Sequence, residues 1–389
     1  MEKSVQSTKI INRNTSIELL RIISMIMIMF HHFAYHGNFE WNFNEVTLPH
    51  LWYDFILMGG KVGVDIFVLI SGYFLIENTE KLFQPKKLLK FWGQVVFYSI
   101  MTYLLSVMLR LNAFEIKQLI KVCLPITYPG WWFASTYFML YLIHPFLNKL
   151  LHGLSKTEYQ YLILMMVLCW SIIPTATTQL FESNSLLWFV TLYGIAGYVN
   201  LYGGNQKLQS KHYFSLYFMV LIITYTVSTT FLFLGTKKEE WSTHAIDFFE
   251  IERLPILLMA ITLFMGFVTL KMNYHKWINM IASATFGVYL IHDSSYIRYY
   301  LWTNIFKINQ YQDSTFLILY SILVVFILYV SCTMIDLIRK KLVEKPYMLF
   351  VNHYTYYFLK SFKIICEMFM DITVRQSRQS GVARATCPD

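Results

Sequence analysis

An arginine and a histidine near the N-terminus are the first residues whose types and spacing could do chemistry. Arg21 and His32 lie eleven residues apart in an apolar stretch, so on an α-helix they share one face, about 16 Å apart along the axis. Ionisable side chains within a membrane helix are costly, which makes a functional role the first hypothesis. The imidazole of His32 could act as a base near physiological pH, and the guanidinium of Arg21 could bind an anionic carrier.

The same residues also have a purely structural interpretation. Arg21 could extend its guanidinium to lipid phosphates at the membrane surface, and His32 could hydrogen-bond a neighbouring helix. Spacing alone leaves both interpretations open. The same holds for His292, which lies at a depth in its own apolar stretch that matches the depth of His32, so that the two could share one site.

The stretch GGKVGVDIFVLISGYFLIE carries three further candidates. Lys61 and Asp65 are four residues apart, a spacing that predicts a local ion pair on one helix face. Ser71 could be a nucleophile, but no GxSxG elbow surrounds it, and a role in packing or ligand contact is the alternative.

Three lysines follow this stretch. Lys86, Lys87 and Lys90 are either ordinary cations of the cytoplasmic side or a rim that binds phosphate. Their spacing does not decide between these interpretations.

The elements that position these residues are predicted to be membrane-spanning helices. The chain of 389 residues is 56% hydrophobic and only 14% charged, whereas a soluble domain carries about 25% charged residues. This composition excludes an ordinary soluble enzyme. We interpret the net charge of +9 as a membrane charge asymmetry, and no nucleic-acid partner is expected. The apolar runs are too long for barrel strands, so the sequence predicts an all-α polytopic membrane helix bundle.

Ten stretches are long and apolar enough to cross a bilayer as helices. They cover residues 17–36, 53–76, 89–109, 131–148, 159–177, 185–201, 213–235, 252–270, 277–302 and 315–336. With this topology, 22 Lys and Arg residues lie on the side of the two termini and seven on the opposite side. That asymmetry predicts that both termini are cytoplasmic.

The sequence divides into a membrane domain and short flanking segments. Residues 1–16 are expected to be a cytoplasmic segment, and residues 17–336 the membrane domain. Residues 337–375 mix basic and aromatic residues and are predicted to form an amphipathic segment along the inner membrane surface. Residues 376–389 are predicted to be disordered. The five cysteines form no CxxC pair, so neither a zinc site nor a disulfide framework is expected, and no metal is predicted.

Four stretches of the chain, in order, resemble the type-3 integral-membrane acyltransferases, which O-acetylate bacterial surface polysaccharides and related glycans. They are LRIISMIMIMFHH, VGVDIFVLISGYFL, WWFASTYFMLYLIHPFLN and FGVYLIHDS, and the resemblance extends from about Ser16 to Lys345. The first resembles the family's motif of Arg, ten residues and His, which falls on Arg21 and His32. Val68 stands where the family often has a second Phe, and the basic run after the second stretch is Lys rather than the commoner Arg.

The resemblance implies acetyl-CoA or another short acyl-CoA as donor. It implies a hydroxyl of a cell-surface polysaccharide or lipid-linked glycan as acceptor, and a location in the bacterial plasma membrane. His32 would be the base or the acyl carrier, with Arg21 binding or orienting the donor. Asp65 or His292 would orient His32, and the lysine run would contact the donor's phosphates.

Two other functions are compatible with a polytopic bundle. A transporter or flippase for lipid-linked saccharides should have halves of matching hydropathy and paired broken helices, and the sequence shows neither. A membrane scaffold without chemistry gives no reason for an arginine and a histidine on one helix face.

Overall fold

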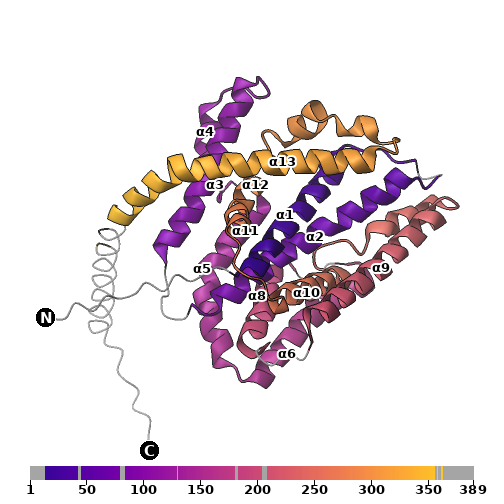
Figure 1. Cartoon of the computed structure of the whole chain (residues 1–389), viewed down its shortest axis with the longest axis horizontal. Coiled ribbons are helices and arrows are strands. Elements are labelled where there is room, and N and C mark those ends of the chain that lie inside the picture. The colour runs from indigo at the N-terminus through magenta and orange to yellow at the C-terminus, as the bar shows by residue number, and fades with distance from the viewer. Residues whose placement is uncertain are drawn as a thin grey trace, which may run out of the picture.

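The computed structural model describes residues 14–42, 45–78, 84–128, 130–179, 183–203, 208–354, 357 and 361. Helices are the regular elements of these residues, which confirms the predicted helix bundle (Figure 1). The longer helices are α1 (Thr15–His36), α2 (Leu48–Leu75), α3 (Pro85–Met108), α5 (Trp132–Gly153), α6 (Lys156–Val167), α8 (Ser185–Tyr202), α9 (Ser210–Gly235), α10 (Leu254–Thr269) and α13 (Leu317–Arg339). The short ones include α4 (Ile116–Val122), α7 (Ile173–Thr177), α11 (Lys276–Ala282) and α12 (Thr285–His292).

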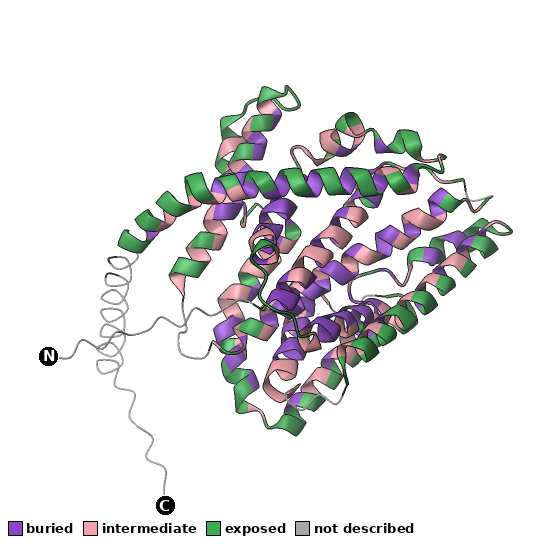
Figure 2. Cartoon of the chain, in the orientation of Figure 1, coloured by how far each residue is buried: buried purple, intermediate pink, exposed green. Residues whose placement is uncertain are grey.

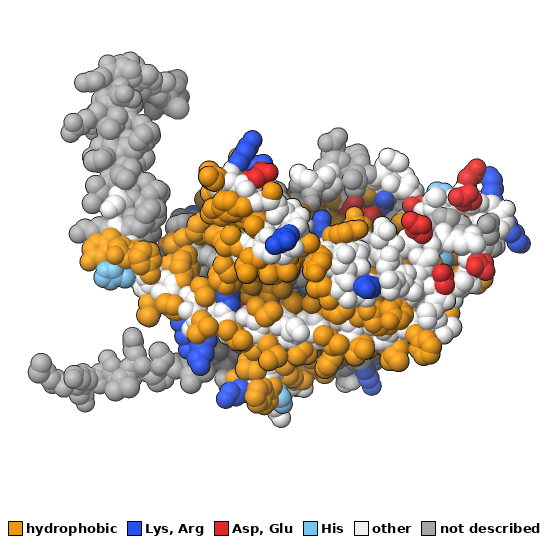
Figure 3. Space-filling view, turned by 90° about the horizontal axis from the view of Figure 1, so that it is seen from above, with side chains coloured by type: hydrophobic (Ala, Val, Ile, Leu, Met, Phe, Trp, Pro, Cys, Tyr) orange, Lys and Arg blue, Asp and Glu red, His pale blue; other side chains and the backbone are white. Residues whose placement is uncertain are grey.

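Seven helices of the described residues are long and apolar enough to cross a membrane. Their bounds are Thr15–His36, Leu48–Leu75, Pro85–Met108, Lys156–Thr177, Ser185–Tyr202, Ser210–Gly235 and Leu317–Tyr354. The chain is therefore a multi-pass membrane protein. Figure 3 shows hydrophobic side chains spread broadly over one face of the molecule, as a lipid-facing surface requires. The count of ten spans and the cytoplasmic placement of both termini remain predictions.

Three of the predicted spans differ from the structure. The stretch 131–148 forms α5, whose polar residues keep it outside the seven apolar helices. The stretch 252–270 forms α10, which has only 16 residues. The stretch 277–302 is not one helix but α11, α12 and the π-helix η4 (Tyr300–Ile305), because the polar run from Asp293 takes side-chain partners on other helices.

Helices α1 and α2 form the centre of the bundle, flanked by α8 and α10 (Figure 1). Figure 2 shows that buried residues concentrate on these helices, whereas α9 and α13 expose one face. Glycines let α1 and α2 approach closely, since a Cβ on Gly63 would lie 2.6 Å from the Ser24 carbonyl oxygen. The close packing holds His32 and the middle of α2 on either side of a common space.

The C-terminal part of the chain continues the last long helix. The helix that begins at Leu317 runs to Tyr354, and the amphipathic segment along the inner membrane surface over residues 337–375 stays a prediction. A π-helix, η6 (Lys340–Glu344), precedes Pro346, and its wider turn accommodates a residue that has no N–H. Residues 376–389 and 1–13 lie outside the described residues, as does most of 355–375.

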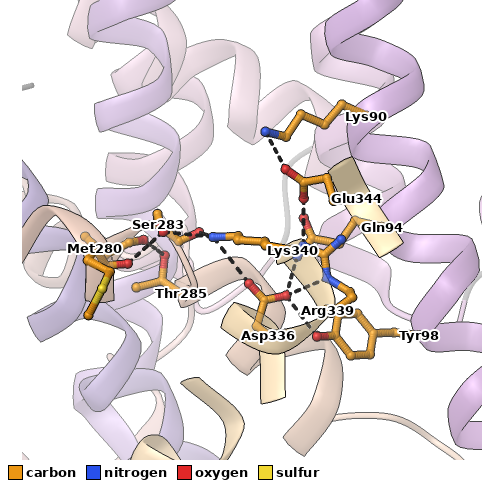
Figure 4. Close-up of polar contacts among 11 residues, drawn as sticks. Lys90, Gln94, Tyr98, Met280, Ser283, Thr285, Asp336, Arg339, Lys340 and Glu344 are labelled. Atoms are coloured by element: carbon orange, nitrogen blue, oxygen red, sulfur yellow. Dashed lines mark hydrogen bonds and ion pairs between the residues drawn. The ribbon is translucent and has the colours of Figure 1, made fainter. Parts of the chain in front are cut away.

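A buried ionic cluster anchors this long helix to α3 (Figure 4). The Asp336 carboxylate accepts hydrogen bonds from the Tyr98 hydroxyl at 2.8 Å and from the Gln94 amide at 3.1 Å, both on α3. It also pairs with the Arg339 guanidinium at 2.8 Å and the Lys340 ammonium at 3.4 Å. Four partners, two of them on α3, therefore compensate one buried negative charge.

The same cluster reaches α12, the helix that carries His292. The Lys340 ammonium donates to the backbone carbonyl and hydroxyl of Ser283, at the joint between α11 and α12. A Cβ on Gly287 of α12 would lie 2.2 Å from the Asp336 carboxyl carbon, so the two helices are in direct contact. At the far end of the cluster, Glu344 joins Arg339 and Lys90 at 2.8 and 2.7 Å.

The contact between α1 and α2 predicts a difference between two glycines on one helix. Gly63→Ala should lower the free energy of unfolding by about 1–3 kcal/mol, because the backbone carbonyl of Ser24 cannot move aside. Gly59→Ala is the control, since the nearest atom to its Cβ, on Met27, is 3.8 Å away. Denaturant unfolding in detergent micelles measures both. Equal unfolding midpoints for the two variants would contradict the predicted contact.

The ionic cluster predicts a large effect for one carboxylate. Asp336→Ala should cost roughly 3–5 kcal/mol of stability, because it removes the more deeply buried of the two carboxylates that pair with the Arg339 guanidinium. Asp313→Ala, at an exposed position, should stay within about 0.5 kcal/mol of the parent. The same unfolding measurement tests this, and a loss no greater than that of the control would mean that the cluster does not stabilise the fold.

Candidate functional site

A cavity of about 410 Å³ lies between α1, α2, α5 and α12. One part of its wall is apolar and includes Met25, Ile28, Val64, Phe67 and Phe286. The remainder is polar and aromatic, with three histidines, four charged side chains and the rings of Tyr35, Trp132, Phe133 and Tyr289. The cavity thus joins an apolar chamber to a polar mouth.

His32 and His292 are in direct contact at this cavity. The His32 Nδ1 lies 2.8 Å from the His292 Nε2, which joins α1 to α12. The His292 Nδ1 lies 2.6 Å from the Val288 carbonyl oxygen, and a carbonyl can only accept, so this nitrogen carries a proton. With both rings neutral, His292 Nε2 must then accept from His32 Nδ1–H. The Nε2 of His32 is left with a free lone pair, and this ring lines the cavity while the His292 side chain is fully buried.

A carboxylate completes the polar group around His32. Asp293, directly after α12, has one oxygen 3.2 Å from the His36 Nε2 and 3.4 Å from the Arg298 guanidinium. Its other oxygen lies 4.0 Å from the His32 Nε2. Asp293 can therefore stabilise a positive charge that develops on the His32 ring. The sequence analysis missed Asp293 and His36, although one adjoins His292 and the other follows His32 by one helical turn.

Lys61 does not form the ion pair that the sequence analysis predicted. Its ammonium pairs with Glu250 at 3.1 Å, and both residues line the cavity. Asp65 is fully buried and accepts a hydrogen bond from the Trp188 indole at 2.9 Å. The prediction was wrong because the loop between η3 (Glu239–Ile246) and α10 brings in a closer carboxylate, which no local spacing can show. Asp65 is also absent from the cavity wall that holds His32.

Arg21 lies on α1 one helical turn before Met25, which lines the apolar part of the cavity. Its side chain is 31% exposed, and its Nε lies 4.0 Å from a carboxylate oxygen of Glu18. Because α1 is unbroken from Thr15 to His36, the face shared by Arg21 and His32 is the one that Met25 and Ile28 carry into the cavity. Arg21 therefore lies on the cavity-facing side of α1, one turn before the first α1 residue that lines the cavity, whereas His32 lines the cavity itself.

The remaining predicted site residues lie elsewhere. The Ser71 hydroxyl donates to the Phe67 carbonyl at 2.8 Å within α2, so its proton is directed to a backbone acceptor rather than to a base. Lys86, Lys87 and Lys90 are exposed at the start of α3, and Lys90 is engaged by Glu344. None of these four residues lines the cavity of His32.

The chain was compared with known proteins. The family model described as "Acyltransferase domain" matches residues 14–336, which include α1 with its arginine and histidine and α12 with His292. No curated protein and no solved structure matches the chain. The match covers most of the 389 residues, and the chain belongs to the type-3 family of membrane acyltransferases.

Proposed function

We propose that the protein transfers an acetyl or other short acyl group from acyl-CoA to a hydroxyl of a cell-surface polysaccharide or lipid-linked glycan, at the bacterial plasma membrane. The observation that carries the proposal is the hydrogen bond from His32 to His292, which leaves the cavity-facing ring with a free lone pair. An imidazole in that state is suited to take a proton from a hydroxyl.

In the direct reaction, the acceptor hydroxyl gives its proton to His32 Nε2 as its oxygen attacks the thioester carbonyl. The carbon–sulfur bond then breaks, and the departing thiolate takes a proton from the imidazolium, which restores the neutral ring. Asp293, with an oxygen 4.0 Å from Nε2, stabilises the transient positive charge. His292 holds the ring orientation through Nδ1.

A two-step reaction uses the same nitrogen. The lone pair of His32 Nε2 attacks the thioester carbonyl, the carbon–sulfur bond breaks, and the thiolate leaves while the ring carries the acyl group as an acylimidazolium. The acceptor oxygen then attacks the acyl carbon, the bond to Nε2 breaks, and the hydroxyl proton passes to the thiolate. Both routes require the same tautomer of His32, so the hydrogen bond to His292 supports each of them equally.

The apolar part of the cavity suits the donor. Met25, Ile28 and Phe67 line it, and these side chains can enclose the short acyl group and the thioester arm. Arg21, one helical turn before Met25 on α1, can pair with a phosphate or orient the donor. Lys86 and Lys87 are exposed on α3 and supply positive charge for further phosphate contacts, whereas Lys90 already pairs with Glu344.

The polar mouth of the cavity suits a neutral sugar. The ion pair of Lys61 with Glu250 offers both a donor and an acceptor to hydroxyl groups, and Trp132 offers an exposed aromatic ring. The two cations of the wall, Lys61 and Arg298, are matched by two carboxylates at 3.1 and 3.4 Å. With neutral histidines the mouth carries no net charge, which favours an uncharged glycan over an acidic one.

The proposal predicts separate losses for the two residues of the first helix. His32→Ala should lower the rate of acyl transfer by about 10²–10⁴-fold, because the base is removed. Arg21→Ala should raise the KM for acyl-CoA by about tenfold, since a charge-assisted contact is lost. Transfer of label from acetyl-CoA in membranes that contain each variant measures both.

His244→Ala is the control for these variants, because its imidazole is exposed, pairs with Asp247 and does not line the cavity. Normal insertion of both test variants with unchanged acyl transfer would reject the catalytic assignment. Glycan transport by the parent without any dependence on acyl-CoA would support a transporter or flippase instead.

The mouth of the cavity predicts an effect on acceptor affinity. Glu250→Gln should raise the acceptor KM by about three- to tenfold with little change in kcat, because a charged hydrogen-bond acceptor is lost away from the reacting atoms. Glu240→Gln is the matched control, since Glu240 forms an exposed pair with Lys238. Steady-state kinetics with varied acceptor measures the effect, and a fall in kcat at unchanged KM would assign Glu250 a different role.

A further inference from the structure

We propose that His32, His36 and Asp293 form a binding site for Zn²⁺ in the cavity. One donor atom from each of these residues lies within 4.8 Å of the others. The two imidazoles are four residues apart on α1, which places them on one helix face. The carboxylate comes from the segment after α12, so the three ligands approach from two separate elements.

The distances are close to those of a zinc site. The His36 Nε2 lies 3.2 Å from one oxygen of Asp293, and the His32 Nε2 lies 4.0 Å from the other. Tetrahedral zinc with bonds of about 2.0–2.1 Å separates its ligand atoms by about 3.4 Å. The pair formed by His36 and Asp293 is already at about this separation, whereas the pair formed by His32 and Asp293 exceeds it by about 0.6 Å. Since all three donor atoms lie within 4.8 Å of one another, a contraction of at most about 1.4 Å at any pair would complete the site. His36 ends α1, where a side chain can shift without deforming a helix interior.

The hydrogen-bond and ion-pair partners of these ligands are also of the kind that surrounds a metal site. Ligating histidines usually donate their other ring N–H to a fixed acceptor, and His32 Nδ1–H donates to His292. The Asp293 carboxylate is held by Arg298 at 3.4 Å. Three protein ligands leave a fourth position, and all three line the cavity, so an ion and one small ligand can enter.

The donor set favours Zn²⁺ over Ca²⁺ and Mg²⁺. Two imidazoles and one carboxylate match the preferences of Zn²⁺, whereas Ca²⁺ and Mg²⁺ favour oxygen donors alone. Bound zinc would occupy the lone pair of His32 Nε2. Zinc would then inhibit acyl transfer, a consequence that rests on the proposed function, whereas the binding itself does not.

The test uses the full chain, free of any affinity tag, in detergent micelles with ZnCl₂ alone. Equilibrium dialysis with metal quantification should give one zinc ion per chain. His36→Gln and Asp293→Asn should each weaken binding at least tenfold, and loss of the outer partner in His292→Ala should weaken it by about 10–100-fold.

Two further variants separate ligand loss from misfolding. His36→Cys should retain zinc binding, because a thiolate is also a zinc ligand. His244→Gln should bind zinc as the parent does, since it removes a histidine that pairs with one carboxylate at 2.7 Å on the exposed surface. Gel filtration and thermal unfolding without metal confirm the fold of each variant.

A parent that binds no zinc, or a His36→Gln variant that binds it as tightly, would overturn the proposal. Equal loss of binding in His244→Gln would overturn it as well. The dialysis result does not depend on acyl transfer, so failure of the proposed function would leave zinc binding intact. Conversely, acyl transfer by a parent that binds no zinc would reject only the metal site.

Discussion

The hydrogen bond between His32 and His292 joins residues 260 positions apart and holds α12 against α1. In a buried setting without water, a ring N–H that lacks an acceptor is costly, so each proton of the pair needs a defined place. The Val288 carbonyl accepts a hydrogen bond from the His292 Nδ1–H, and the His292 Nε2 accepts one from the His32 Nδ1–H. This series of hydrogen bonds leaves the lone pair of His32 Nε2 free. The chemistry available in the cavity follows from that lone pair.

The break in the helix at His292 is what brings the carboxylate to this pair. In a continuous helix, Asp293 would point about 100° away from His292 around the axis. The helix instead ends at His292, and Asp293 pairs with His36 and Arg298. The next residue, Ser294, donates its hydroxyl to Thr102 at 2.8 Å. Irregular backbone at membrane depth is tolerated where it is buried in protein or lines a cavity, and here it does both.

Helical periodicity made part of the site predictable. Once the first apolar stretch is a helix, Arg21 and His32 must share a face, and the structure keeps that helix unbroken. The partner of Lys61 was not predictable, because Glu250 arrives through a loop whose path depends on tertiary packing. The partners of the basic residues after Asp336 were not predictable for a related reason. The buried Asp336 carboxylate pairs with both Arg339 and Lys340, and it is held to α3 by contacts that no local pattern reports.

Under the proposed function, the unequal polarity of the cavity wall would let one histidine serve two substrates of different character. A thioester and its acyl group, which need few hydrogen bonds, would lie against Met25 and Ile28, whereas a sugar would use the donors and acceptors near Lys61. Because the charged side chains at the mouth are paired, the electric field that they exert on a neutral reactant is weak. The charge that develops on the imidazole during transfer is then the largest local change, and Asp293 is already placed to stabilise it. A stronger positive field at the mouth would favour the acceptor alkoxide but oppose the imidazolium, so pairing Lys61 and Arg298 with carboxylates keeps uncompensated positive charge away from the His32 ring.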